Sequence, residues 1–258
     1  MISTGAQRPY FMACGHEQSY LGLDIELLWL FLHDVDPDIK VPGDKLRKVD
    51  SFIAYFKTRC LSLYQPRHRS RIRQYIKDKP TKWGIKFWVL ADSHNGYTID
   101  FNVYIGKSAG TTVSENGLGY DLVMKLMQPF LHQGYYLFFD NFYTSVTLVK
   151  DLFDLGVLAT GTVTESCRGF PENLKNGKQW AKKLERGSMC WERNNPCLAL
   201  QWIDNKVVSV LTTIYNANDK VSVIRKSKVA NVWKEIIVQQ PEAINRYNKY
   251  RNGVDCSD

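Results

Sequence analysis

The chain has 258 residues, of which 44% are hydrophobic and 23% charged. This composition is that of an ordinary globular protein and excludes wholesale disorder. No apolar run approaches the roughly 20 residues that span a bilayer, and the N-terminus lacks the pattern of a secretory signal. We therefore expect no membrane partner and a place in the cytoplasm or the nucleus. The net charge of +8 favours a polyanion as partner without proving it.

The first half of the chain predicts helices followed by a hairpin. Apolar residues crowd together at helical spacing over 20–33 and recur every three or four residues over 44–63, where Asp44 is a plausible N-cap. Apolar runs over 84–90 and 97–105 flank the turn His94-Asn95-Gly96. These runs predict two paired strands.

The middle of the chain alternates between helix and strand patterns. A helix is predicted over 120–131, with Pro129 kinking or ending it. A strand follows over 135–139, then a helix over 144–155 that Gly156 closes, and then a strand over 157–163. After Thr164 the pattern becomes that of a β-rich block, with strands predicted over 197–203 and 207–214. A helix-like stretch follows from Pro241.

Six scattered cysteines form no C-x-x-C pair, so a zinc finger built from them is not expected. We interpret them as free thiols. Strand spacing leaves open the alternative that Cys190 and Cys197 face each other across a hairpin.

A basic row lies between Arg67 and Lys82, with seven Lys or Arg and one acid. In an extended strand its alternating arginines share one face, and such a row could contact phosphates. The alternative is a solvated edge strand that its charge protects from aggregation. The candidate phosphate-contacting residues are Arg67, Arg69, Arg71, Arg73, Lys77 and Lys82.

Two apolar strands each end on an aspartate, FWVLAD at Asp92 and LFFD at Asp140. If these strands are neighbours in one sheet, both carboxylates emerge at the same edge, a few ångströms apart. Carboxylates that close repel each other unless a proton or a cation joins them, and Mg²⁺ prefers such ligands. The alternative for Asp140 is a helix cap or a solvated strand end.

Three blocks of the sequence, over 79–97, 117–163 and 247–258, closely resemble the piggyBac family of transposases and their domesticated relatives. Fainter similarity extends back to about residue 20. The resemblance implies an α/β fold in which a ribonuclease-H-like mixed sheet is flanked by helices, with an N-terminal helical region and a β-rich insertion. It places the family's three essential aspartates on Asp92, Asp140 and Asp255, and a fourth acid on Asp258.

The same resemblance divides the chain into four parts. Residues 1–78 would form an incomplete N-terminal helical region for dimerisation and DNA binding, and 165–245 the insertion. Residues 79–164 and 246–258 would form the first and last parts of the catalytic core.

The resemblance also implies an activity. The aspartates would bridge two Mg²⁺ or Mn²⁺ ions about 4 Å apart. These ions would drive excision and strand transfer at TTAA sites in double-stranded DNA. The expected location is the nucleus, the basic row becomes a candidate DNA-contacting surface, and a homodimer is left open.

Two departures from the family keep a second hypothesis in view. A block with an Ile-Asp-Glu signature, which the family has between the equivalents of Pro66 and Arg67, is missing here, and the chain stops at Asp258 within the last core motif. One hypothesis is a metal-dependent transposase; the alternative is a domesticated or truncated DNA-binding protein that does not cut. An unrelated phosphatase or glycosidase is disfavoured by the long motif blocks, and a glycosidase would need no metal.

Overall fold

The computed structural model describes residues 49–66, 69–74, 86–104, 113–229 and 232–251, without the side chains of residues 69–74, 86, 104 and 229. The chain divides into two compact units, residues 1–56 and 57–258. Helix α2 (Asp50–Leu63) begins in the first unit and ends in the second. It confirms the later part of the helix predicted over 44–63, whereas the helix predicted over 20–33 and the N-cap Asp44 lie outside the described residues.

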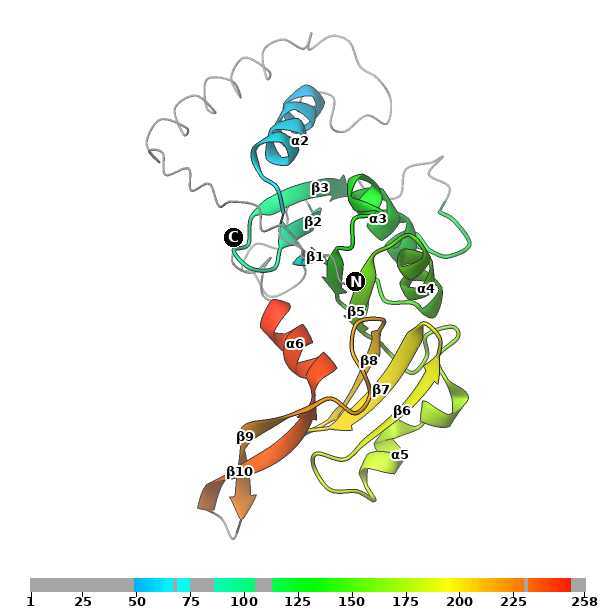
Figure 1. Cartoon of the computed structure of the whole chain (residues 1–258), viewed down its shortest axis with the longest axis vertical. Coiled ribbons are helices and arrows are strands. Elements are labelled where there is room, and N and C mark those ends of the chain that lie inside the picture. The colour runs from blue at the N-terminus through cyan, green and yellow to red at the C-terminus, as the bar shows by residue number, and fades with distance from the viewer. Residues whose placement is uncertain (1–48, 67–68, 75–85, 105–112, 230–231, 252–258) are drawn as a thin grey trace, which may run out of the picture. The chain divides into compact units, whose positions relative to one another are not determined.

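The second unit is built on one eight-stranded sheet in the order β3-β2-β1-β4-β5-β8-β7-β6 (Figure 1). The strands are β1 (Arg69–Gln74), β2 (Lys86–Asp92), β3 (Thr98–Tyr104), β4 (Tyr136–Phe139), β5 (Leu158–Thr162), β6 (Met189–Asn194), β7 (Cys197–Ile203) and β8 (Val207–Thr212). Strands β1, β2 and β3 pair antiparallel, whereas β1, β4 and β5 run parallel to one another. The sheet is therefore mixed, as the predicted α/β class requires.

Helices cover both faces of β4. On one face, α3 (Leu118–Met127) and α4 (Val146–Asp154) join a large buried cluster that includes Leu137 and Phe139. On the other face, α6 (Glu242–Tyr250) packs Tyr247 and Tyr250 against Phe138. A strand that is buried on both faces needs apolar residues at every position, which explains the uninterrupted run of β4.

The local predictions for the middle of the chain are confirmed. Helix α3 ends at Met127, and the short 3-10 helix η1 (Gln128–Phe130) contains Pro129. Helix α4 ends at Asp154, and Gly156 follows with a φ of 73°, a left-handed conformation that glycine adopts without a steric cost. The strands predicted over 84–90, 97–105, 135–139 and 157–163 correspond to β2, β3, β4 and β5.

The β-rich block continues the same sheet. Strand β5 pairs antiparallel with β8, and the hydroxyls of Thr160 and Thr212 are hydrogen-bonded over 2.7 Å in the buried seam. One sheet includes strands from both sides of the predicted boundary between residues 164 and 165. It also includes β1, which lies before residue 79, where the core was predicted to begin. The short elements η2 (Glu172–Leu174) and α5 (Gly177–Ala181) lie between β5 and β6.

A second, two-stranded sheet is formed by β9 (Lys220–Val229) and β10 (Val232–Pro241), which the sequence analysis did not predict. Its chain leads directly into α6, which confirms the helix-like stretch after Pro241.

The described cysteines are free thiols: Cys60, Cys167, Cys190 and Cys197. Cys190 lies opposite Gln201 and Cys197 opposite Asn194 in the β6–β7 hairpin, so the alternative in which the two cysteines face each other is wrong. Within the described residues, no helix combines the length and the apolar character needed to cross a membrane.

Candidate functional site

Asp140 begins the turn that joins β4 to α4. Its carboxylate accepts a hydrogen bond from the backbone N–H of Asn141 at 2.6 Å, and its carbonyl accepts one from the Thr144 hydroxyl at 2.9 Å. The helix itself is capped by Ser145, whose hydroxyl accepts from the N–H of Leu148 at 3.1 Å. The alternative in which Asp140 is the helix cap is therefore wrong, and the Asp140 carboxylate remains half-buried beside the turn.

Two side chains from other elements lie beside the Asp140 carboxylate. Thr162, at the end of β5, donates a hydrogen bond to its Oδ1 at 3.4 Å. The Thr162 hydroxyl also lies 3.4 Å from the hydroxyl of Tyr247, a buried residue of α6. Asp140, Thr162 and Tyr247 therefore form one polar cluster contributed by β4, β5 and α6.

Neither Thr162 nor Tyr247 was predicted from the sequence as a site residue. Both carried a usable signal, because Thr162 lies at the end of a predicted strand beside the one that ends at Asp140. Tyr247 is the first residue of the last family-like block. A search for polar residues at strand ends and within the family-like blocks would have identified Thr162 and Tyr247 as site candidates.

Asp92 has a different environment from Asp140. It has no exposed surface, and its Oδ2 accepts a hydrogen bond from the Tyr64 hydroxyl at 2.9 Å. Its Oδ1 accepts from the backbone N–H of His94 at 2.7 Å, within the turn between β2 and β3. Asn95 donates to the Tyr64 hydroxyl at 2.8 Å, and the rings of Tyr64 and Tyr97 stack with centroids 4.1 Å apart. Asp92 thus fastens the β2–β3 turn to the segment before β1.

The sheet places Asp92 and Asp140 at opposite ends of its strands. Strand β1 lies between β2 and β4, and β2 runs antiparallel to both. Ser70 of β1 is in register with Asp92 on one side and with Leu137 on the other. Asp92 is therefore level with a residue three positions before Asp140. The expectation that the two strands are neighbours with both aspartates at one edge is wrong, because β1 inserts between them with opposite polarity to β2.

The distance implied by this register decides whether the two aspartates share an ion. Three residues along a strand and two spacings between strands each amount to about 10 Å, which separates the two backbones by roughly 14 Å. Ions in a two-metal site lie only about 4 Å apart, within reach of shared carboxylates. At the end of β1 nearest Asp140, the sequence has Arg73 and Gln74, and neither is a carboxylate.

The described side chains do not fit the two-ion site that the family resemblance implies. Within residues 49–251, apart from the undescribed gaps, no three His, Cys, Asp or Glu side chains group closely enough to hold a metal ion. Asp255 and Asp258, together with Arg67, Lys77 and Lys82, lie outside the described residues. We therefore derive no chemical step through bound ions.

The basic row lies partly on β1. Arg69, Arg71 and Arg73 belong to this strand, which is hydrogen-bonded to β2 on one side and to β4 on the other. The alternative of a charged edge strand is therefore wrong, because β1 is an interior strand. A contact between these arginines and DNA stays a prediction.

Tyr120 and Tyr135, near the core sheet, are among the described tyrosines whose pKa values are raised. Burial, and secondarily the charge of Asp92, raises the pKa of Tyr135. A 2.7 Å hydrogen bond to Asp151, together with burial, raises the pKa of Tyr120 to about 12. Both phenols stay protonated near neutral pH, so neither acts there as a general base.

Comparisons with known proteins agree on one family. A sequence model of the family described as transposase IS4 matches residues 27–258. The human piggyBac transposable element-derived protein 3 is 31% identical over 252 residues, which cover 90% of this chain and 41% of that protein. The human piggyBac transposable element-derived protein 2 is 27% identical over 259 residues, which cover 90% of this chain and 42% of that protein. The chain therefore spans about two fifths of the length of these relatives.

A solved structure supports the fold. The cryo-EM structure of a piggyBac transposase synaptic complex with hairpin DNA matches 83% of this chain and 44% of its own, with a TM-score of 0.65 and 24% identity. This likeness confirms the predicted fold class, a ribonuclease-H-like mixed sheet flanked by helices. With a family model that matches most of the sequence, the chain belongs to the transposase IS4 family of the piggyBac type.

Proposed function

We propose that this chain binds double-stranded DNA without cutting it, as a domesticated relative of the piggyBac-type transposases. The observation that carries the proposal is the placement of Asp92 and Asp140 at opposite ends of the core strands. Strand cleavage and transfer at TTAA sites, which the family resemblance implies, require carboxylates that converge on the same pair of ions. Asp92 does not meet that requirement.

DNA is the ligand that the other observations support. The chain belongs to a transposase family and carries a net charge of +8. A solved structure that shares its fold is a piggyBac transposase synaptic complex with hairpin DNA. Phosphate neutralisation by lysine and arginine supplies most of the affinity of sequence-independent DNA binding. A DNA ligand also makes the nucleus the proposed place of action.

The test measures binding and cleavage on the same duplexes, one with a central TTAA and one with that sequence scrambled. Fluorescence anisotropy at a series of salt concentrations should show binding that weakens with salt, with a log–log slope of about −0.9 for each phosphate contact. Denaturing gels of the same mixtures with Mg²⁺ or Mn²⁺ should show intact strands. Metal-dependent nicks at TTAA that disappear in Asp140→Asn would instead establish the cleaving enzyme.

A further inference from the structure

The β9–β10 hairpin has one covered face and one open face. Val223, Ile236 and Val238 pack with Trp202 in a small buried cluster beneath the hairpin. On the opposite face, Ile224 and Ile237 lie directly across from each other and remain well exposed. The hairpin is therefore anchored from below and leaves its outer surface accessible.

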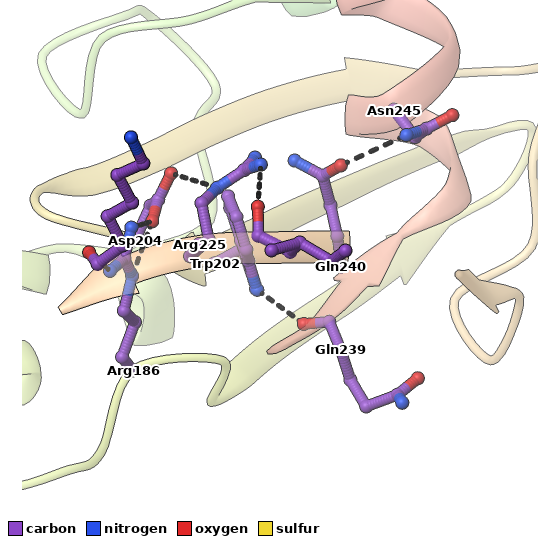
Figure 2. A network of polar contacts seen from close by, with 9 residues as sticks. Arg186, Trp202, Asp204, Arg225, Gln239, Gln240 and Asn245 are labelled. Carbon is purple, nitrogen blue, oxygen red and sulfur yellow. Dashed lines mark hydrogen bonds and ion pairs between the residues drawn. The ribbon is translucent and has the colours of Figure 1, made fainter. Parts of the chain in front are cut away.

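Polar contacts fix the hairpin to the turn between β7 and β8 (Figure 2). Asp204 pairs with Arg186, and also with Arg225 of β9 at 3.2 Å. The Arg225 guanidinium lies 5.9 Å from the centre of the Trp202 ring, and the Trp202 indole donates to the carbonyl of Gln239 at 2.9 Å. Because these contacts tie β9 and β10 to β7 and the turn after it, the surface that the hairpin presents is preorganised.

A cavity of about 900 Å³ opens between the hairpin and that turn, and we call it the hairpin pocket. Its charged lining residues are Arg186, Arg225, Lys226, Lys234, Asp204 and Glu235. Four cations against two carboxylates leave a surplus of two positive charges. One of the carboxylates, Asp204, already serves two arginines. The pocket is therefore complementary to an anionic ligand.

An aromatic ring lies among these charges. Trp233 lines the hairpin pocket with 68% of its surface exposed, and it sits opposite Lys228 in the hairpin. A broad, solvent-exposed ring beside lysines is the arrangement with which proteins hold single-stranded nucleic acid, because bases stack on the ring while cations follow the phosphates. A base-paired duplex offers no free base face for such stacking.

We infer that the hairpin pocket binds an unpaired stretch of DNA, with phosphates near Lys226 and Lys234 and a base stacked on Trp233. The inference rests on the proposed DNA-binding function and adds a second, structurally distinct contact to it. An acidic peptide would satisfy the charges but would not need the ring. Variants without the ring and variants without the lysines therefore distinguish unpaired DNA from an acidic peptide as the ligand.

The test uses the full chain and a fluorescent oligothymidylate, with the duplex as second probe. Trp233→Ala should weaken oligothymidylate binding about tenfold, the effect of losing one stacked base, and leave duplex binding nearly unchanged. The double variant Lys226→Ala/Lys234→Ala should reduce the magnitude of the salt slope for the single strand by about 1.4, or 0.7 for each lost phosphate contact.

The chain offers matched controls for both changes. Trp191 is a partly exposed tryptophan on β6, and Lys182 and Lys183 are neighbouring exposed lysines after α5. Trp191→Ala and Lys182→Ala/Lys183→Ala should leave both affinities at their wild-type values. Because Trp233 is mostly exposed, its variant should also melt at the wild-type temperature.

The outcomes separate the inference from the proposed function. A wild-type chain that binds neither probe overturns the proposed function, and with it this inference. If it binds the duplex but not the oligothymidylate, or if Trp233→Ala binds the single strand as tightly as the wild type, only the inference is overturned. Loss of binding on changing the lysines, with no effect of the ring, would indicate a purely charge-based site for another anion.

Discussion

At the scale of single residues, Asp92 shows how hydrogen bonds can satisfy a carboxylate at the end of a buried strand. A buried carboxylate is costly unless donors satisfy its oxygens. Tyr64 and the N–H of His94 supply one donor to each Asp92 oxygen, and Asn95 in turn donates to Tyr64. The role that these contacts support for Asp92 is structural: it holds the β2–β3 turn against the segment before β1.

This role predicts coupled losses of stability. Asp92→Asn and Tyr64→Phe should each lower the free energy of unfolding by about 1–3 kcal/mol, because each disrupts the hydrogen bond between the Tyr64 hydroxyl and the buried Asp92 side chain. The double variant should cost less than the sum of the two, since both changes remove the same hydrogen bond. Urea unfolding of the four proteins measures the coupling. A gain in stability for Asp92→Asn would point instead to a repulsive carboxylate that waits for a cation.

The buried thiol of Cys197 predicts how the free energy of unfolding depends on pH. Burial raises the pKa of its thiol to about 11 from the ordinary value of 9.0, although Lys150 and Arg193 act in the opposite direction. The folded chain then retains a proton that the unfolded chain loses between these values, so stability falls as pH rises from 9 to 11. In total, the free energy of unfolding falls by about 3 kcal/mol.

The variant Cys197→Ala removes this dependence. At neutral pH it should be about 1 kcal/mol less stable than the wild type, because it leaves a small cavity in the core. That deficit should shrink above pH 9 and reverse before about pH 10, because the wild type loses about 1.4 kcal/mol for each pH unit between the two pKa values. Urea unfolding across this range measures it, with the more exposed Cys190→Ala as control. A constant deficit would show that Cys197 does not titrate there.

At the scale of elements, two different residues organise the turn and cap the helix at the junction from β4 to α4. Asp140 organises the turn, whereas Ser145 caps the helix. Ser145→Ala should therefore lower the free energy of unfolding by about 1 kcal/mol, the usual cost of a lost N-cap. Thr147→Ala, an exposed change in the first turn of the same helix, should have little effect. Equal costs for the two variants in urea unfolding would refute the assignment of the cap.

Elements with a clear period could be predicted from the sequence. The α3, α4 and β2–β3 patterns have regular apolar spacing and end at Pro129, Gly156 and the turn before Tyr97. The β9–β10 hairpin was missed because its open face carries Ile224, Trp233 and Ile237. Apolar residues on both faces of a ribbon obscure the alternation that reveals a strand.

At the scale of the whole molecule, the strand order was the information that local patterns could not supply. The sequence showed that two strands end on Asp92 and Asp140, but not that β1 lies between them or that β2 runs the other way. Pairing between distant segments depends on the complete sheet, so an edge shared by two strand ends cannot be deduced from the strands alone. The fold class was confirmed through family resemblance, whereas the expectation that Asp92 and Asp140 share one edge of the sheet was wrong.

The basic row is predicted to contact duplex DNA, and removing two of its lysines tests this. If the residues after β1 contact the phosphate backbone, Lys77→Ala/Lys82→Ala should weaken duplex binding and reduce the magnitude of its salt slope by about 1.8, or 0.9 for each lost contact. Lys182→Ala/Lys183→Ala is the charge-matched control, because it lowers the net charge equally at a distant part of the sequence. Anisotropy titrations compare the two variants, and equal losses would mean that only net charge matters.

The central claim is that Asp92 and Asp140 belong to different ends of the sheet and do not share metal ions. Its most direct test is a Mn²⁺ titration, followed by the electron paramagnetic resonance signal of the free ion, on the wild type, Asp92→Asn and Asp140→Asn. Each protein is first shown to be folded by circular dichroism. We predict that Asp92→Asn gives the same isotherm as the wild type. Two Mn²⁺ ions per wild-type chain, lost alike in both variants, would contradict this account.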